Sequence, residues 1–286
     1  MTTVNAVLAS TRAELLRLRK WPALWVMTGA WLLLNVMFVY VFNYLSYTTG
    51  STTPRGEGIP KEALLAEMLP AAAPISAVQG LPMFGGAIMM ILGALAIGSG
   101  YGWGTWKTVF TQGPSRLATT AGSLVALVLA IVAIVALTFV LDLGLSTLVA
   151  ATESQTIVWP GLGDIAPALG GGVLIASMWM LGGALIGTLA KGPALGVGLG
   201  LVWVLAVENL LRGVANLLGG MDVVTDHLPG TAAGSLAGGL GAGGGTDGTP
   251  GVFTTLDTAS ASWLLVAYLV VFAGITAVVV RRRDLA

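Results

Sequence analysis

Six long apolar runs constrain this chain more than any other feature of its sequence. They lie at about residues 23–45, 77–99, 118–150, 166–190, 194–215 and 262–280. Each run is long enough to cross the hydrocarbon core of a bilayer as a helix. A helix is required because lipid offers the backbone no hydrogen-bond partner, and the alternating pattern of a barrel strand is absent. We expect an all-α integral membrane protein with six transmembrane helices in one domain, residues 1–286.

The composition agrees with a membrane location. Hydrophobic residues make up 56% of the chain and charged residues only 9%, whereas a soluble domain carries roughly 25% charged residues. The chain has no cysteine, which excludes disulfides, thiolate metal sites and cysteine nucleophiles. The formal net charge is zero, so nothing indicates a nucleic-acid partner.

The distribution of charge predicts the orientation. With the N-terminus in the cytoplasm, ten of the thirteen basic residues fall on the cytoplasmic side, against two of the thirteen acidic residues. Cytoplasmic segments are enriched in Lys and Arg. We therefore expect a multi-pass protein of the cytoplasmic membrane with both termini inside, and a first run that is retained as a span.

The segment before the first run has a helical pattern. Val4, Val7, Leu8, Thr11, Leu15 and Leu18 recur at steps of three and four residues and form one stripe. Two interpretations fit: a helix that lies in the cytoplasmic interface, or a basic flank that only enforces orientation. We favour the interfacial helix because the stripe is regular.

A short aromatic segment, GYGWGTWKT, separates the second and third runs. Trp103, Trp106 and Phe110 recur at positions i, i+3 and i+7, which predicts one face of a short helix with Lys107 beside it. The aromatic face could anchor the loop at the membrane surface, or it could dock into a groove on a cytosolic partner. Periodicity alone does not decide between the two.

Three ionisable residues lie near the outer ends of spans. The third run is longer than a bilayer needs, and Asp142 lies far enough along it to reach the outer boundary. We expect a hydrated carboxylate at a helix end there rather than a buried functional group. Glu208 and Arg212 are four residues apart, so we expect them to pair on one helix face.

Glycine is frequent in the fourth and fifth runs and in the segment that follows them. Gly183 with Gly187, and Gly192 with Gly196, are pairs of small residues four apart. They are consistent with tight packing inside the bundle, with a subunit interface or with a bending helix. We expect residues 227–251 to form an outer loop whose glycine-rich second half is mobile.

The sequence lacks the residue patterns that a nucleotide-binding or hydrolytic enzyme would need. Lys107 and Thr108 resemble the end of a phosphate-binding loop, but Trp106 stands where that loop needs its second glycine. The single histidine, His227, is expected on the outer surface, and no span core holds a lysine that could serve a serine nucleophile. We expect no catalytic, cofactor-binding or metal-binding residues in this chain.

Four stretches, in this order, resemble the permease subunits of type-2 ATP-binding-cassette (ABC-2) exporters. They are RAELLRLRKWPALWVM, GYGWGTWKTVFTQGPSRLATTAGSLVAL, WVLAVENLLRGVANLLGGMDVVTDHLPGTAAGSL and VVVRRRDLA. The first is similar to the family's N-terminal elbow helix and the second to its cytoplasmic coupling helix. The third is similar to the end of its fifth span and the last to its basic C-terminal stop.

The resemblance implies a function and partners. Two permease subunits, identical or related, would form the pathway in membrane lipid, and two cytosolic ATPase subunits would bind ATP and Mg²⁺ and drive export. The residues implied for coupling are Tyr101, Gly104, Thr105, Lys107 and Arg116, beside the aromatic face described above. The nearly charge-free span cores favour a hydrophobic or amphipathic substrate. A stand-alone six-span carrier or channel is the alternative.

Overall fold

The computed structural model describes residues 3–50, 60–112, 115–218, 220–243 and 249–283, and within these ranges it contains helices and no strands. Six helices are long and apolar enough to cross a membrane, which is consistent with a multi-pass membrane protein. They are Pro22–Thr49, Pro70–Gly102, Arg116–Thr152, Leu162–Ala190, Pro193–Ala215 and Thr258–Arg282. All six predicted runs are therefore confirmed as long helices.

Three of these spans contain a π-helical turn. The first span consists of α2 (Pro22–Val36), the π turn η1 (Met37–Val41) and α3 (Phe42–Thr49). The second consists of the 3₁₀ turn η2 (Pro70–Ala72), α5 (Ala73–Gln79), the π turn η3 (Leu81–Gly85) and α6 (Gly86–Gly102). The fifth consists of α10 (Pro193–Leu201), the π turn η4 (Val202–Val207) and α11 (Glu208–Leu218). Such turns add a residue to the helix and often lie at functional sites.

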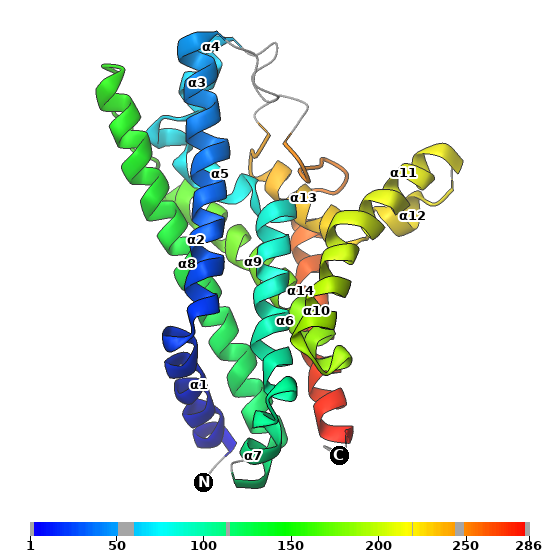
Figure 1. The fold of residues 1–286 in the computed structure, drawn as a ribbon. Helices are drawn as coiled ribbons and strands as arrows, with labels where there is room; N and C mark the ends of the chain where they lie inside the picture. Colours follow the sequence, from blue (N-terminus) through cyan, green and yellow to red (C-terminus); the bar gives the residue numbers. More distant parts are fainter. Residues whose placement is uncertain (1–2, 51–59, 113–114, 219, 244–248, 284–286) are drawn as a thin grey trace.

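The remaining spans are regular helices, and shorter helices connect them. The long helices are α8 (Arg116–Thr152), α9 (Leu162–Ala190) and α14 (Thr258–Arg282). The short ones are α1 (Thr3–Lys20), α4 (Lys61–Glu67), α7 (Thr105–Gln112), α12 (Asp222–Thr225) and α13 (Pro229–Gly239). Helices α1 and α7 and the C-terminal end of α14 lie at one end of the bundle, whereas α4 lies at the other (Figure 1).

Local sequence explains where α14 begins. The Asp257 carboxylate accepts hydrogen bonds from the backbone N–H groups of Ala259 and Ser260, each at 3.0 Å, and so caps the helix. Hydrogen bonding by Ser260 to this exposed carboxylate lowers the pKa of Asp257 below its usual value. The cap fixes the point at which the last span starts.

Glycines allow the central helices α6 and α9 to touch. A Cβ on Gly93 would lie 1.9 Å from the Met180 carbonyl oxygen, and a Cβ on Gly183 would lie 2.0 Å from the Met90 carbonyl oxygen. Gly187 likewise faces α6, and Gly196 of α10 faces Gly187. For Gly183, Gly187 and Gly196, the tight-packing interpretation is therefore the observed one.

The expectation of an outer loop over residues 227–251 is wrong for its first part. Residues 229–239 form α13, whose residues Pro229 to Ala237 are buried among α5, α9, α14 and η3. Its glycines allow the following chain to lie directly on it: a Cβ on Gly234 would lie 2.1 Å from the Gly251 carbonyl oxygen. The expected mobile stretch falls partly on residues 244–248, which lie outside the described residues.

Candidate functional site

The loop between the second and third spans contains the predicted short helix, α7. Gly104, which separates α6 from α7, has φ +68°, a left-handed conformation that glycine adopts readily. The aromatic segment therefore bends sharply at Gly104, and α7 starts at Thr105. A second signal in this segment is Ser115, whose hydroxyl accepts a hydrogen bond from the Ala118 N–H at 3.3 Å and caps α8.

Trp106 packs inward against the end of α6. Its indole Nε1 donates to the Ile97 carbonyl oxygen at 3.0 Å, and its ring stacks on Phe110 with centroids 5.3 Å apart. Gly100 is required for this approach, because a Cβ there would lie 2.4 Å from the indole nitrogen. The Tyr101 ring also lies close to Trp106, with ring centroids 6.2 Å apart. Trp106 thus holds α7 onto the bundle.

The expected single stripe of three aromatic residues is wrong in one respect. Trp103 lies at the end of α6, before the bend, and is 71% exposed. Thr105 and Lys107 are also exposed. The segment therefore has an inner pair, Trp106 and Phe110, and an outer group formed by Trp103, Thr105 and Lys107.

Arg116 connects α7 and α8 to the end of the last span. Its guanidinium lies 5.7 Å from the centroid of the Phe110 ring, and its Nη1 donates to the Arg283 carbonyl oxygen at 2.6 Å. Arg283 in turn donates to the Thr188 carbonyl oxygen at the end of α9, at 2.5 Å. Arg116 therefore binds the protein's own C-terminal segment, a contact that its sequence position alone did not indicate.

The N-terminal helix α1 packs along α8 rather than across the end of the bundle (Figure 1). A Cβ on Gly122 of α8 would lie 2.5 Å from the Ser10 Cβ, so the two helices are in close contact. The expected stripe is divided: Thr11 and Leu18 are buried against the bundle, whereas Val4 is 68% exposed and Leu8 is 51% exposed. The buried face of α1 also includes Ala6 and Glu14.

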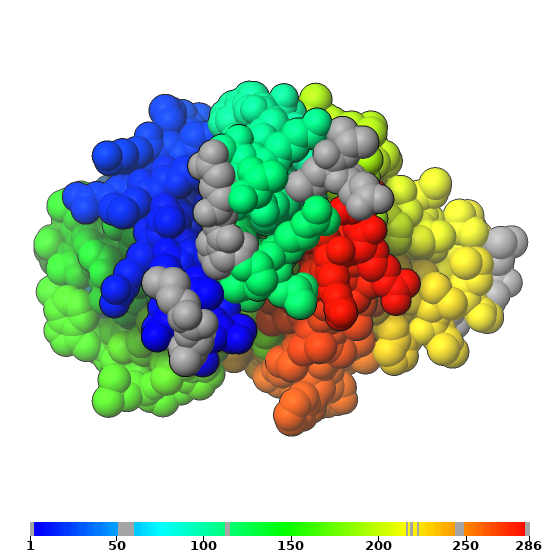
Figure 2. Space-filling model, turned by 90° about the horizontal axis from the view of Figure 1, so that it is seen from below, coloured from blue at the N-terminus to red at the C-terminus, as the bar shows by residue number. Residues whose placement is uncertain are grey.

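A cleft of about 410 Å³ lies where α1, α6, α7 and α8 meet. Seen from this end of the molecule, α7 lies between the N-terminal helix and the end of α14 (Figure 2). The cleft is lined mainly by apolar groups, including Ala13, Ala96 and Trp106. Glu14 and Arg17 form an ion pair in its wall, and Arg17 also donates to the Ala96 carbonyl oxygen at 3.0 Å. This is the chemistry of a pocket for a partly apolar molecule.

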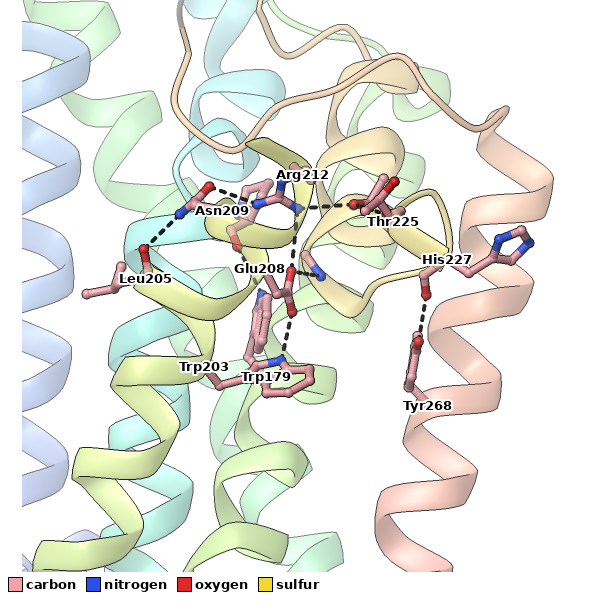
Figure 3. A network of polar contacts seen from close by, with 12 residues as sticks. Trp179, Trp203, Leu205, Glu208, Asn209, Arg212, Thr225, His227 and Tyr268 are labelled. Carbon is pink, nitrogen blue, oxygen red and sulfur yellow. Dashed lines mark hydrogen bonds and ion pairs between the residues drawn. The ribbon is translucent and has the colours of Figure 1, made fainter. Parts of the chain in front are cut away.

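Glu208 and Arg212 form the predicted ion pair at the other end of the bundle (Figure 3). The Glu208 side chain is 1% exposed, and its carboxylate lies 3.5 Å from Arg212 Nη1. It also accepts from the Trp203 indole N–H and from the Gly230 backbone N–H, each at 2.8 Å. A Cβ on Gly230 would lie 2.1 Å from the carboxylate oxygen, so this approach requires glycine.

Arg212 connects the ion pair to neighbouring elements. Its guanidinium donates to the Thr231 hydroxyl at 3.1 Å and to the Asn209 side-chain oxygen at 2.9 Å, and it lies 4.6 Å from the centroid of the Phe253 ring. The network therefore fastens α11 to α13 and to the segment before α14. His227 is exposed, as expected, and its backbone carbonyl accepts from the Tyr268 hydroxyl at 2.6 Å (Figure 3).

The expectation of a hydrated Asp142 is wrong, because the side chain is completely buried. The first span lies alongside α8 near Asp142 and contacts this residue. Asn35 Nδ2 donates to Asp142 Oδ1 at 2.7 Å, and the Tyr40 hydroxyl donates to the Asp142 backbone carbonyl oxygen at 3.0 Å. Asn35 and Tyr40 were not predicted from the sequence. The available signal was a side-chain amide in the middle of an apolar run, where polar groups usually bond another helix.

Comparison with known proteins adds no family. No family model matches this chain, and no curated protein matches it. The assignment of a function therefore rests on the sequence patterns and on the geometry of the two ends of the bundle.

Proposed function

We propose that this chain is the membrane-spanning permease subunit of an ATP-driven exporter of the ABC-2 type. The observation that carries the proposal is the outer group of the α7 segment. Trp103, Thr105 and Lys107 are exposed, and α7 lies at the same end of the bundle as α1 and the C-terminal end of α14 (Figure 1). An exposed aromatic side chain beside a cation suits docking to another protein.

The proposed partners are those that the resemblance to ABC-2 permeases implies. With no phosphate-binding loop in this chain, two cytosolic ATPase subunits would bind ATP and Mg²⁺ and contact the α7 segment. A second permease subunit, identical or related, would complete the pathway. Closure of the ATPases would shift the permease between two packings, because they bind one packing more tightly than the other.

The inner pair of the α7 segment would transmit that movement. Trp106 is bonded to α6, and Arg116 joins α8 to the C-terminal segment. A push on α7 would therefore reach the second, third and sixth spans. The apolar cleft beside α7 favours a hydrophobic or amphipathic substrate, which would enter from the cytoplasmic side of the membrane.

One observation favours the alternative of a stand-alone carrier. Asp142 and Glu208 are both buried within spans, and ionisable residues in such positions often mark an ion pathway. The span cores are therefore less free of charge than the sequence indicated, which weakens the case for a hydrophobic or amphipathic substrate. Glu208, however, already has a structural partner in Arg212.

The first test is purification from the native membrane in a mild detergent, followed by mass spectrometry of the proteins that accompany the chain. Under the exporter proposal, a soluble protein with a Walker A loop co-purifies with it. Repeated recovery of this chain alone, under conditions that preserve other membrane complexes, contradicts the exporter and favours the carrier.

The second test separates docking from membrane anchoring. The double variant Trp103→Ala/Lys107→Glu changes only exposed side chains and should lower recovery of the ATPase at least tenfold. The control is Trp159→Ala/Lys61→Glu, which changes the same residue types at exposed positions on other connections. Equal recovery with both double variants would show that the outer group is not the docking surface. Trp106 is left unchanged because it packs inside.

A further inference from the structure

The surroundings of Asp142 are unusual for a carboxylate. Its side chain has no exposed surface, and Asn35 is 3% exposed. Among the described residues there are two ion pairs, Glu14–Arg17 and Glu208–Arg212, and neither includes Asp142. An ionised carboxylate without a cation is costly in such surroundings.

Two buried oxygen atoms at this contact have no hydrogen-bond partner among the described residues. One is Asp142 Oδ2 and the other is Asn35 Oδ1. They belong to the two groups that the 2.7 Å bond from Asn35 Nδ2 to Asp142 Oδ1 already brings together. An ionised Asp142 would leave both oxygens as acceptors with no donor, and each such buried group lowers stability.

We propose that Asp142 and Asn35 form a proton-binding site, with the proton held on Oδ2 of Asp142. The proton comes from water and forms an O–H bond, and no other bond changes. Asp142 then donates to Asn35 Oδ1 while it accepts from Asn35 Nδ2. One proton thereby supplies partners for both oxygens and makes a two-point contact between a carboxylic acid and an amide.

Among the described residues, the groups that hydrogen-bond Asp142 are uncharged, and the charged groups farther along the same contact are acidic. Tyr40 of η1 bonds the backbone carbonyl of Asp142, and Phe139 of α8 packs on Ala73 and Ala77 of α5. Farther along the seam between the first span and α8, Glu153 accepts hydrogen bonds from two tyrosines. Glu67 of α4 accepts from Asn43 of the first span at 3.4 Å. Among the described residues, the charged groups that bond across this seam, Glu67 and Glu153, are thus acidic.

A small cavity lies beside the site. Its volume is about 30 Å³, and Trp31, Asn35 and Gly80 are among the residues that line it. This is room for water, and water next to the Asn35 amide would provide a route for the proton to exchange. The π-helical turn η1 begins two residues after Asn35. Such turns often lie at functional sites. The site does not depend on the proposed exporter function.

Infrared spectroscopy of the full-length chain in lipid nanodiscs tests the proposal. At neutral pH, the carbonyl stretch of a protonated carboxylic acid should be present, should shift in D₂O, and should vanish in Asp142→Asn. The matched control is Glu208→Gln, which changes a carboxylate that is 1% exposed and should leave the band. If Asp142→Asn leaves the whole protonated-acid signal in place, Asp142 is ionised and the proposal is wrong.

A second variant covers the case in which Asp142→Asn fails to fold. Asn35→Leu removes the amide and leaves the acid without its partner, so the same band should move to higher frequency. An unchanged band would overturn the acid–amide contact. The measurement is repeated with sodium replaced by choline. If the wild-type spectrum changes on replacement, the site holds a cation instead of a proton.

Discussion

Asp142 and Glu208 are the two most deeply buried carboxylates among the described residues, and they are stabilised in opposite ways. Glu208 faces a guanidinium and accepts hydrogen bonds from the indole N–H of Trp203 and the backbone N–H of Gly230. Asp142 faces one side-chain amide and no cation among the described residues. Burial alone therefore does not define the state of an acidic residue. The donors around it do, and they favour a charge at Glu208 and a proton at Asp142.

Both carboxylates lie beside a π-helical turn. The turn η4 ends directly before Glu208 and contains Trp203, its indole donor. The turn η1 contains Tyr40, which bonds the backbone of Asp142. A π-helical turn thus contributes one hydrogen-bond donor at each site. Trp203 of η4 donates to the Glu208 carboxylate and Tyr40 of η1 donates to the Asp142 backbone carbonyl, while Asp142 itself lies on the regular helix α8.

The largest effect is expected at Glu208. Glu208→Gln keeps the shape but removes the charge that Arg212 faces, leaving a partly buried cation without its counterion. We expect a loss of about 3 kcal/mol in the free energy of unfolding, because breaking a buried pair from one side is strongly destabilising. Denaturant unfolding of the purified chain in bicelles measures it.

The control for that variant is Asn209→Ala. It removes one exposed partner of Arg212 and leaves the ion pair in place, so we expect a loss of about 1 kcal/mol or less. Equal losses for the two variants would mean that the carboxylate charge contributes little, and the contrast with Asp142 would disappear.

A somewhat smaller loss is expected when Asp142 is replaced by an apolar residue. Asp142→Leu leaves both polar ends of the buried Asn35 amide unpaired, which should cost about 2 kcal/mol. Adding Asn35→Leu removes the orphaned amide as well and should restore most of the stability. A double variant as unstable as the single one would show that packing, and not hydrogen bonding, determines the loss.

The sequence predicted the local features of this comparison. The ion pair of Glu208 and Arg212 was predictable because four residues along a helix bring two side chains together without any knowledge of the fold. The six spans were predictable because length and hydropathy are properties of a single segment. Contacts that depend on one helix are thus within the reach of sequence reasoning.

The state of Asp142 was not predictable in that way. Its position along α8 correctly placed it far from the helix start, but exposure depends on what lies beside the helix. The first span contacts Asp142 through Asn35 of α2 and Tyr40 of η1, and the Asp142 side chain is buried. Likewise, the inward turn of Trp106 depends on the space above Gly100, and the burial of α13 depends on glycine contacts with the later segment around Gly251. These features belong to pairs of elements distant in sequence.

Removal of one donor at each site should give unequal effects. Trp203→Phe removes the indole N–H that bonds the charged Glu208, so we expect a loss of about 1.5 kcal/mol. Tyr40→Phe removes a hydroxyl that bonds a neutral backbone carbonyl of α8, and we expect about 0.5 kcal/mol. Both are measured by the same unfolding titration. A larger loss of stability for Tyr40→Phe than for Trp203→Phe would contradict the assignment of an ionised Glu208 and a neutral Asp142.

The smallest effect is expected for Asp142→Asn, although it removes a buried acidic group. An amide at this position can accept from Asn35 Nδ2 and donate to Asn35 Oδ1, which is the pattern of the protonated acid. The free energy of unfolding should therefore change by less than about 0.5 kcal/mol, within the range of neutral substitutions. If Asp142 were ionised and held a cation, the amide would lose that ligand, and the loss would approach the one expected for Glu208→Gln. The change from acid to amide should therefore destabilise the bundle at Glu208, where the negative charge pairs with Arg212. It should leave the stability unchanged at Asp142, because a protonated acid and an amide make the same two hydrogen bonds with Asn35.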